Sequence, residues 1–269
     1  MSLVHASRMG LISKNTTATS RPYGGIYDII TSATSTATVA ASYGSGIAVY
    51  SQVSPFAATT QTWSVYQGTT NATKVTSIPV LNGAVDFTWE FWIYFTTLPS
   101  TGSDNKFILC CRENNAHYTP CDMLIQLSGG TPKILYIASA NNSAWSVLYF
   151  GTRTLLTNTW YHMALQKKGT AFECWINGTR DANYTYSSAT LTNFSDRTYA
   201  YFGAQNNAGT FMYADGQTTY TNIKFSPYAV YASGATITPP TTPFTSIGTS
   251  SWIVTHGRGP GFSGVNQSF

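Results

Sequence analysis

The sequence predicts an all-β protein, a sandwich or barrel of antiparallel strands. Charged residues make up 9% of the chain and aromatic residues 14%, and this composition suits half-buried pleated surfaces better than salt-bridged helices. Short apolar segments recur at regular spacing with Gly, Asn and Pro between them, which is typical of β-sandwiches and barrels. No segment predicts a helix of three turns. At 269 residues, the chain can bury a core without disulfides or metals.

The two ends of the chain are predicted to lie outside this sandwich. Residues 1–55 are a predicted N-terminal arm and linker, because residues 1–21 hold basic residues but no acid and residues 31–46 are small and polar. Residues 246–269 are Gly-rich and are a predicted C-terminal tail. The predicted sandwich therefore spans residues 56–245.

The most informative strand is predicted at residues 85–98, VDFTWEFWIYFTTL. Successive residues of a strand point to opposite faces. One face carries Phe87, Trp89, Phe91, Ile93 and Phe95, and the other carries Thr88, Glu90, Trp92 and Tyr94. Because both faces are largely aromatic, we expect a strand in the middle of a sheet that is covered on both sides, or one whose second face holds a ligand.

Further strands are predicted before and after this one. They lie at residues 63–68, 74–81, 106–112, 122–130, 132–139, 145–153, 199–204, 211–216 and 221–231. Residues 159–176 form a predicted hairpin in which Gly169 supplies the turn. Asn177-Gly178 follows it and is a strong signal for a second hairpin turn.

Four segments in this order resemble the concanavalin A-like lectin/glucanase superfamily, and more closely its laminin G-like, pentraxin-like jelly roll. They are WSVYQGTTNATKVTSIP, VDFTWEFWIYF, TWYHMALQKKGTAFECWING, and YFGA followed by NIKFSPYAVYASGATITPPTTPF. The resemblance implies a two-sheet antiparallel jelly-roll sandwich, to which the arm and the tail are added. The last segment is similar to the closing segments of phage and environmental-virus proteins, but Lys224 and Val230 stand where the family pattern has arginines.

No catalytic residue is predicted, although some relatives hydrolyse glycans. That reaction needs two carboxylates, about 5–5.5 Å apart for retention or about 6.5–9.5 Å for inversion. The strands here offer only Glu90, or Glu173, or Asp86 with Glu90, and we interpret this last pair as a solvated rim pair. His162 has no Ser or Cys partner in a nucleophile motif, so we interpret it as a packed strand histidine.

No cofactor is expected either. Some branches of the family use calcium, but the ten acidic residues here are scattered and form no dense ligand loop. The cysteines are expected to be free buried thiols. The alternative is a zinc site made of Cys110, Cys111, Cys121 and His117, although this spacing fits no zinc-ligand pattern.

Four aromatic residues are candidates for binding a ligand by stacking on sugar rings: Trp92, Tyr94, Tyr161 and Trp175. Packing in the protein interior is the alternative for each of them. If the hairpin at residues 159–176 has a function beyond packing, we expect that function to be binding.

The function expected is that of a structural virion protein of a phage, a capsid decoration or a tail-associated knob. Its lectin-like jelly roll would serve assembly and adhesion to host-surface glycans, with other virion proteins and copies of itself as partners. The alternatives are a stand-alone carbohydrate-binding lectin and, third, a glycoside hydrolase. The net charge of +4 forms no basic stripe, so nucleic acid is not an expected partner. The sequence shows no signal peptide and no 18-residue apolar stretch, so we expect synthesis in the host cytoplasm and no membrane partner.

Overall fold

The structure is a computed structural model that describes residues 28–30, 48–53, 61–67, 73–76, 81–102, 104–112, 118–194, 199–207, 210–213, 218–242 and 252–255. Side chains are described at residues 81–102, 104–112, 118–194, 200–203, 218, 220 and 222–242. Every secondary-structure element in the described ranges is a β-strand, which confirms the all-β prediction. These ranges contain no helix long and apolar enough to span a membrane.

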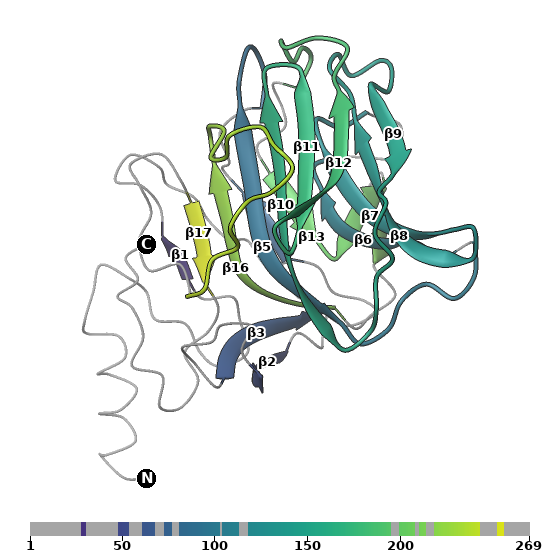
Figure 1. Ribbon diagram of the computed structural model, residues 1–269, viewed down its shortest axis with the longest axis vertical. Helices are drawn as coiled ribbons and strands as arrows, with labels where there is room; N and C mark the ends of the chain where they lie inside the picture. The colour runs from purple at the N-terminus through teal and green to yellow at the C-terminus, as the bar shows by residue number, and fades with distance from the viewer. Residues whose placement is uncertain are drawn as a thin grey trace.

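Two antiparallel sheets form the fold (Figure 1). The large sheet has the order β1-β17-β16-β5-β10-β11-β12, and β3 pairs with β16 and with β2. Its strands are β1 (Asp28–Ile30), β2 (Ala48–Val53), β3 (Gln61–Gln67), β5 (Phe87–Phe95), β10 (Thr159–Lys168), β11 (Ala171–Ile176), β12 (Thr179–Thr185), β16 (Thr218–Ser226) and β17 (Trp252–Thr255).

The small sheet has the order β4-β13-β6-β7-β8-β9. Its strands are β4 (Thr73–Thr76), β6 (Lys106–Cys110), β7 (Asp122–Ser128), β8 (Thr131–Ala138), β9 (Val147–Phe150) and β13 (Tyr199–Phe202). A separate hairpin joins β14 (Ala204–Asn207) to β15 (Thr210–Tyr213). The two stacked antiparallel sheets confirm the predicted jelly-roll sandwich.

Both predicted hairpin turns are present. Gly169, between β10 and β11, has a φ of 57°. Asn177 and Gly178, between β11 and β12, have φ values of 49° and 81°, and two consecutive positive φ values characterise the tight turn that matches the twist of antiparallel strands. These two turns bring β10, β11 and β12 together as one meander.

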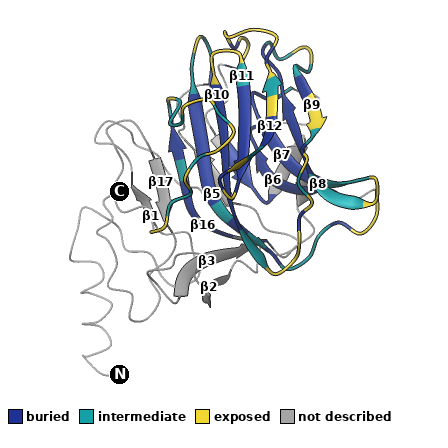
Figure 2. Ribbon diagram, viewed as in Figure 1, coloured by how far each residue is buried: buried dark blue, intermediate teal, exposed yellow. Residues whose placement is uncertain are grey.

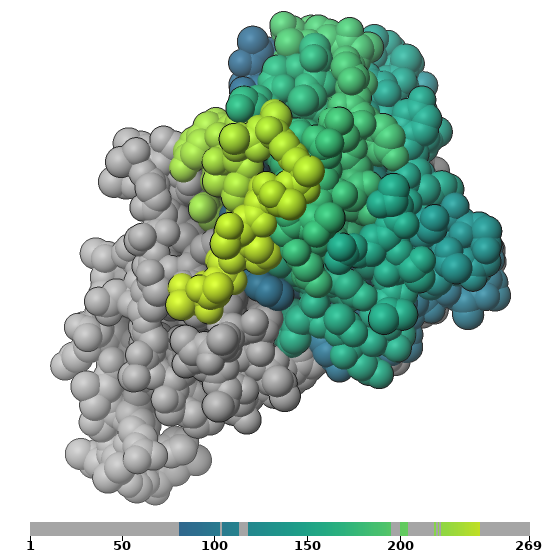
Figure 3. All heavy atoms as spheres, viewed as in Figure 1, coloured from purple at the N-terminus to yellow at the C-terminus, as the bar shows by residue number. Residues whose placement is uncertain are grey.

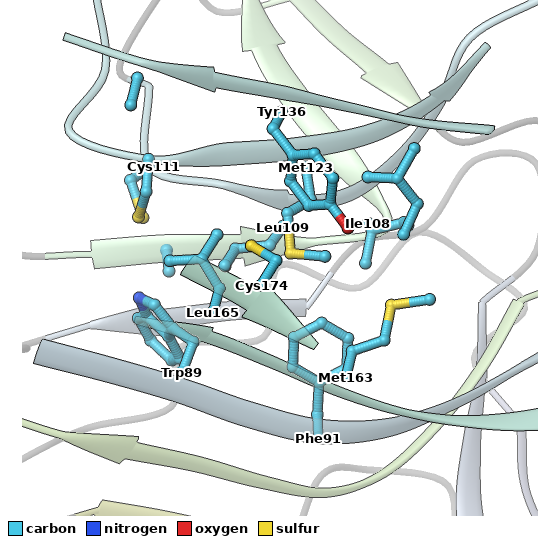
Figure 4. Close-up of a cluster of buried hydrophobic side chains, with 14 of the residues drawn as sticks. Trp89, Phe91, Ile108, Leu109, Cys111, Met123, Tyr136, Met163, Leu165 and Cys174 are labelled. Carbon is cyan, nitrogen blue, oxygen red and sulfur yellow. The ribbon is translucent and has the colours of Figure 1, made fainter. Parts of the chain in front are cut away.

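The core lies between the sheets, and the predicted face of β5 forms one side of it. Phe87, Trp89, Phe91, Ile93 and Phe95 are each at most 1% exposed. Residues of the small sheet, including Leu109 and Met123, pack toward Trp89 and Phe91 (Figure 4). Each such side chain contributes roughly 1.5–3 kcal/mol on burial, so the aromatic face of β5 is a major source of stability.

The outer face of the large sheet is covered by a crossing segment of the same chain. Residues 227–239, called the closing segment below, leave the end of β16 and cross β10 and β11 (Figures 1 and 3). At the far end, Ile237 N donates to Gly178 O and Arg180 N donates to Ala235 O, each at 2.8 Å. The segment also contacts Thr88 and Glu90, so the first half of β5 is covered on both sides, whereas Trp92 and Tyr94 are half-buried. Figure 2 shows β5, β10 and β11 as mostly buried.

Parts of the predicted arm and tail are strands of the large sheet. Residues 28–30 pair with residues 252–255, which in turn pair with β16, and residues 48–53 pair with β3. Most of the predicted arm and tail lies outside the described residues, so the predicted domain boundaries stay a prediction.

Candidate functional site

A row of polar side chains fixes the closing segment to the outer face of the large sheet. Gln166 Nε2 donates to Tyr231 O at 3.0 Å, and Gln166 Oε1 accepts from Tyr231 N at 2.8 Å. Thr88 Oγ1 donates to Tyr228 O at 3.0 Å and accepts from Val230 N at 3.1 Å. These buried side chains supply the hydrogen bonds that a strand partner would otherwise give the closing segment.

Glu90 is the centre of a buried polar network beside this row. Its Oε1 accepts a hydrogen bond from Tyr231 OH and lies 3.0 Å from His162 Nε2, and Lys224 Nζ lies 3.9 Å from its Oε2. Burial by itself raises the pKa of Glu90, but the interactions with His162, Tyr231 and Lys224 outweigh burial and lower that pKa below its ordinary value. Glu90 is therefore ionised at neutral pH and is unsuited to donate a proton to a leaving group.

His162 has the surroundings of a packed residue. Its side chain is fully buried, and its ring centroid lies 5.4 Å from that of Trp92. Glu90 is the hydrogen-bond partner of Nε2, and Nδ1 has no hydrogen-bond partner among the described residues. No described hydroxyl or thiol is hydrogen-bonded to His162, so the described residues form no nucleophile–base pair around it.

The interpretation of Asp86 and Glu90 as a solvated rim pair is wrong for Glu90. The closing segment covers Glu90, which is 3% exposed, whereas the Asp86 side chain is 39% exposed and accepts from Gly169 N at 2.8 Å. Four residues of a strand span roughly 13 Å, which exceeds either carboxylate spacing used in glycan hydrolysis. Glu173, the third acid considered, is buried and lies 3.4 Å from Arg180 Nη1.

Two of the four predicted ligand-binding residues are buried. Trp175 is 0% exposed, and its Nε1 donates to Gly234 O at 3.2 Å beneath the closing segment. Tyr161 is 4% exposed, packs in the core and accepts from Leu156 N through its hydroxyl at 2.8 Å. Neither ring presents a face to a ligand, so interior packing, the alternative interpretation, describes both.

The other two predicted residues are half-buried on the outer face of β5. Trp92 packs beside His162, and Tyr94 packs beside Trp160 with ring centroids 5.4 Å apart. Tyr94 OH donates to Asn158 Oδ1 at 3.2 Å. The structure therefore does not bring the four predicted residues together as one exposed surface.

A stacked aromatic pair that the sequence analysis did not single out lies where the edges of the two sheets meet, and one of its two rings is exposed. Tyr149 on β9, the edge strand of the small sheet, stacks on Tyr184 of β12, the edge strand of the large sheet. Their ring centroids are 4.9 Å apart and their planes differ by 28°. Tyr149 is 55% exposed, the highest value among the described aromatic residues, so its ring is available to a ligand.

Tyr184 is held in place by its hydroxyl. Tyr184 OH donates to Phe150 O at 2.7 Å. Burial and the neighbouring Asp181 raise the pKa of Tyr184, so its hydroxyl keeps its proton and remains a donor.

Asp181 fixes the chain just after β9. It accepts from Thr152 N at 2.9 Å, from Arg153 N at 2.6 Å and from Tyr136 OH at 2.7 Å. The close approach requires glycine at position 151, because a Cβ there would lie 1.9 Å from Asp181 Oδ2. The backbone just after Tyr149 is therefore held in place by hydrogen bonds to Asp181.

The four cysteines are buried free thiols in this structure. Among the described residues no group of three or more His, Cys, Asp or Glu side chains could hold a metal ion. His117, the fourth residue of the zinc alternative, lies outside the described residues.

Comparison with known protein families identifies the superfamily. Residues 67–224 match the family model described as the concanavalin A-like lectin/glucanases superfamily. This match covers more than half of the chain, and the chain belongs to that superfamily. No curated protein matches the chain.

Solved structures share the fold at low sequence identity. The binding domain of botulinum neurotoxin serotype D is 12% identical, with 77% of this chain and 48% of that chain covered and a TM-score of 0.52. The enzymatically active domain of tailspike protein 2 of bacteriophage CBA120 is 13% identical, with 74% of this chain and 29% of that chain covered and a TM-score of 0.51. The chain thus spans less than half the length of either structure, and these likenesses show the fold alone.

Proposed function

We propose that the chain is a non-enzymatic structural protein of a phage virion whose jelly roll binds glycan at the edge formed by β9 and β12. The observation that carries the glycan part is the exposed ring of Tyr149, stacked on the half-buried ring of Tyr184. A tyrosine ring with an apolar face and a polar hydroxyl suits ligands that are part apolar and part polar, as sugar rings are.

The absence of catalysis is proposed from the state of the carboxylates. Glu90 and Glu173 are buried among their partners, and Asp86 lies too far along the strand to act with Glu90. The closing segment also crosses the outer face of the large sheet over Glu90, so a glycan would have to displace it to reach that carboxylate (Figure 3).

The virion role is supported by three observations. The sequence at residues 201–204 and 222–244 resembles the closing segments of phage proteins. One solved structure with the same fold is a bacteriophage tailspike. The low content of charged residues, 9%, suits close packing of identical copies because little like-charge repulsion accumulates. Residues 28–30, 48–53 and 252–255 pair within the chain's own large sheet, so the proposed contacts with neighbouring subunits through added strands are assigned to the remainder of the predicted arm, residues 1–55, and tail, residues 246–269.

The glycan part is tested with purified protein on an array of bacterial surface polysaccharides and oligosaccharides. We expect binding that Tyr149→Ala weakens at least tenfold, because the substitution removes the most exposed ring. Tyr228→Ala is the matched control, since Tyr228 is an exposed tyrosine, 40%, on the closing segment. Tyr94→Ala tests the outer face. Loss of binding in Tyr94→Ala with full binding in Tyr149→Ala would place the site on β5 instead.

The virion part is tested by sedimentation with particles. We expect the full chain to co-sediment with purified particles at a fixed copy number. Deletion of residues 1–30 should leave the jelly roll folded but prevent its incorporation. A protein that binds glycan and never sediments with particles would be a stand-alone lectin, the alternative function.

A further inference from the structure

Two buried cysteines face each other across the connection between β6 and β7. Cys110 pairs with Asp122 at the end of the β6–β7 ladder, so Cys111 and Cys121 are the next residues along the two antiparallel segments. Their Sγ atoms lie 3.6 Å apart, and both residues are 0% exposed. Directly opposed residues of antiparallel segments have Cα atoms about 4.5–5.5 Å apart, within the range that a disulfide bridges.

The local structure holds this pair in register. Asp122 Oδ1 accepts from Cys111 N at 2.8 Å and from Thr119 Oγ1 at 2.8 Å. Arg112 Nη2 lies 3.4 Å from Asp122 Oδ2. These contacts tie the residues on both sides of the connection to one carboxylate, so the two thiols stay opposed without a covalent bond.

The other two cysteines are placed differently. Cys110 neighbours Cys111 in sequence, so its side chain points to the opposite face of the sheet, where its Sγ lies 3.7 Å from Asp122 Oδ2. Cys174 is on β11 of the other sheet and lies across the core (Figure 4). The geometry thus selects one pair of the four thiols.

We propose that Cys111 and Cys121 are a redox-sensitive pair that forms a cross-strand disulfide in oxidising surroundings. The bond closes a loop of residues 112–120 and locks the β6–β7 connection. In a reducing cytoplasm the pair stays as two thiols, whereas outside the cell it becomes a disulfide.

The oxidant in this proposal is a small-molecule disulfide such as oxidised glutathione. The thiolate of one cysteine attacks a glutathione sulfur, which forms a mixed disulfide and releases one glutathione thiolate. The second protein thiolate then attacks the protein sulfur of that mixed disulfide and releases the second glutathione. Two protein thiols are oxidised to one disulfide and one glutathione disulfide is reduced to two thiols, while the protein's two protons pass to the released thiolates.

Burial sets the rate of this reaction. Burial raises the pKa of Cys121, which lowers the fraction of reactive thiolate. The connection must therefore open locally before an oxidant reaches the pair. Oxidation of the folded protein should be slow, and oxidation during refolding should be fast.

The test is peptide mapping of the full chain refolded in reduced or oxidised glutathione. Trypsin cuts after Arg112, between the two cysteines, so the disulfide joins a peptide ending at Arg112 to the following peptide that contains Cys121. We expect thiol titration in denaturant to fall from four thiols to two after oxidation. Four thiols retained after refolding in oxidised glutathione would overturn the proposal.

Neighbouring variants make the assignment specific. Cys110→Ser should keep the cross-linked peptide and Cys111→Ser should lose it, although the two residues are adjacent. The oxidised wild type should melt roughly 5–10 °C above the reduced protein, as expected for a loop of this length. A cross-link to the peptide that contains Cys174 in wild-type protein would also contradict the proposal, as would a cross-link that is lost in Cys110→Ser and kept in Cys111→Ser, because one tryptic peptide holds both Cys110 and Cys111.

Discussion

Replacing Tyr231 with Phe tests the network that holds the closing segment over the large sheet. The change removes the hydroxyl that donates to Glu90 and keeps the ring, whose centroid lies 5.7 Å from that of Trp175. A hydrogen bond to a charged group contributes about 1.5–3 kcal/mol. Glu90 keeps His162 and Lys224 as partners, so we expect a loss within this range. In a domain of this size the corresponding decrease in Tm is roughly 3–12 °C.

The pH dependence gives this prediction a second readout. The pKa of Glu90 is lowered in the folded protein, so its contribution to stability is present above the unfolded-state pKa and is lost as pH falls through the folded-state pKa. The Tyr231 hydroxyl is one cause of the lowered pKa. The difference in unfolding free energy between wild type and Tyr231→Phe should therefore be largest at neutral pH and should narrow as pH falls below about 4.5.

Urea denaturation followed by tryptophan fluorescence measures both readouts at several pH values. Tyr228→Phe is the control, since Tyr228 lies on the same segment but is 40% exposed, and a surface change of this kind costs less than about 0.5 kcal/mol. If Tyr231→Phe and Tyr228→Phe had equal, small effects at neutral pH, the closing segment would not depend on Glu90 and the reasoning would fail.

Three further predictions concern the stability of the fold and the effect of calcium. Gly178→Ala should destabilise the protein more than Gly83→Ala. Both glycines have positive φ, but of the two only Gly178 would bring its new Cβ against another group, Ile237 O at 2.6 Å. Equal losses of about 1–2 kcal/mol in thermal melts would show that the closing segment shifts without cost to make room for the Cβ. Phe91→Ala should cost about 3–5 kcal/mol in urea titrations because it empties the centre of the core, and a loss below about 1 kcal/mol would mean that the two sheets pack differently. Calcium added after chelation should leave Tm unchanged, since the ten acidic residues are scattered, and a large rise would reveal a calcium site.

The strands could be predicted from sequence because their signals are local. Alternation in residues 85–98 placed Phe87, Trp89, Phe91, Ile93 and Phe95 on the core face. Asn177-Gly178 marked the turn between β11 and β12. Every segment predicted between residues 63 and 231 overlaps a strand. These features depend on neighbouring residues and on side-chain period, which the sequence displays directly.

The sequence could not show that the closing segment is what covers the outer face of the large sheet. A strand was predicted through residue 231, but β16 ends at Ser226 and the chain then leaves the sheet as the closing segment. This segment is held by Gln166, Thr88 and Glu90, which lie more than 60 residues away in the chain. Trp175 is therefore buried beneath the closing segment, whereas Tyr161 is buried because its side chain lies on the core face of β10.

The stacked pair of Tyr149 and Tyr184 was not predicted for a related reason. Tyr149 belongs to the apolar run Val147–Phe150, which gives no sign that its strand lies at a sheet edge. Its partner Tyr184 comes from the edge strand of the other sheet, so only the stacking of the sheets brings the two rings together.

Mapping a bound glycan by NMR tests the central claim most directly. Backbone amide shifts of the labelled protein would be followed while an oligosaccharide that binds on the array is added. We predict that the perturbed amides lie at residues 146–153 and 183–187, around Tyr149 and Tyr184. Perturbations centred on Glu90, Trp92 and the closing segment, with none around Tyr149, would contradict the claim that the chain covers Glu90 with its own closing segment and binds glycan at the sandwich edge.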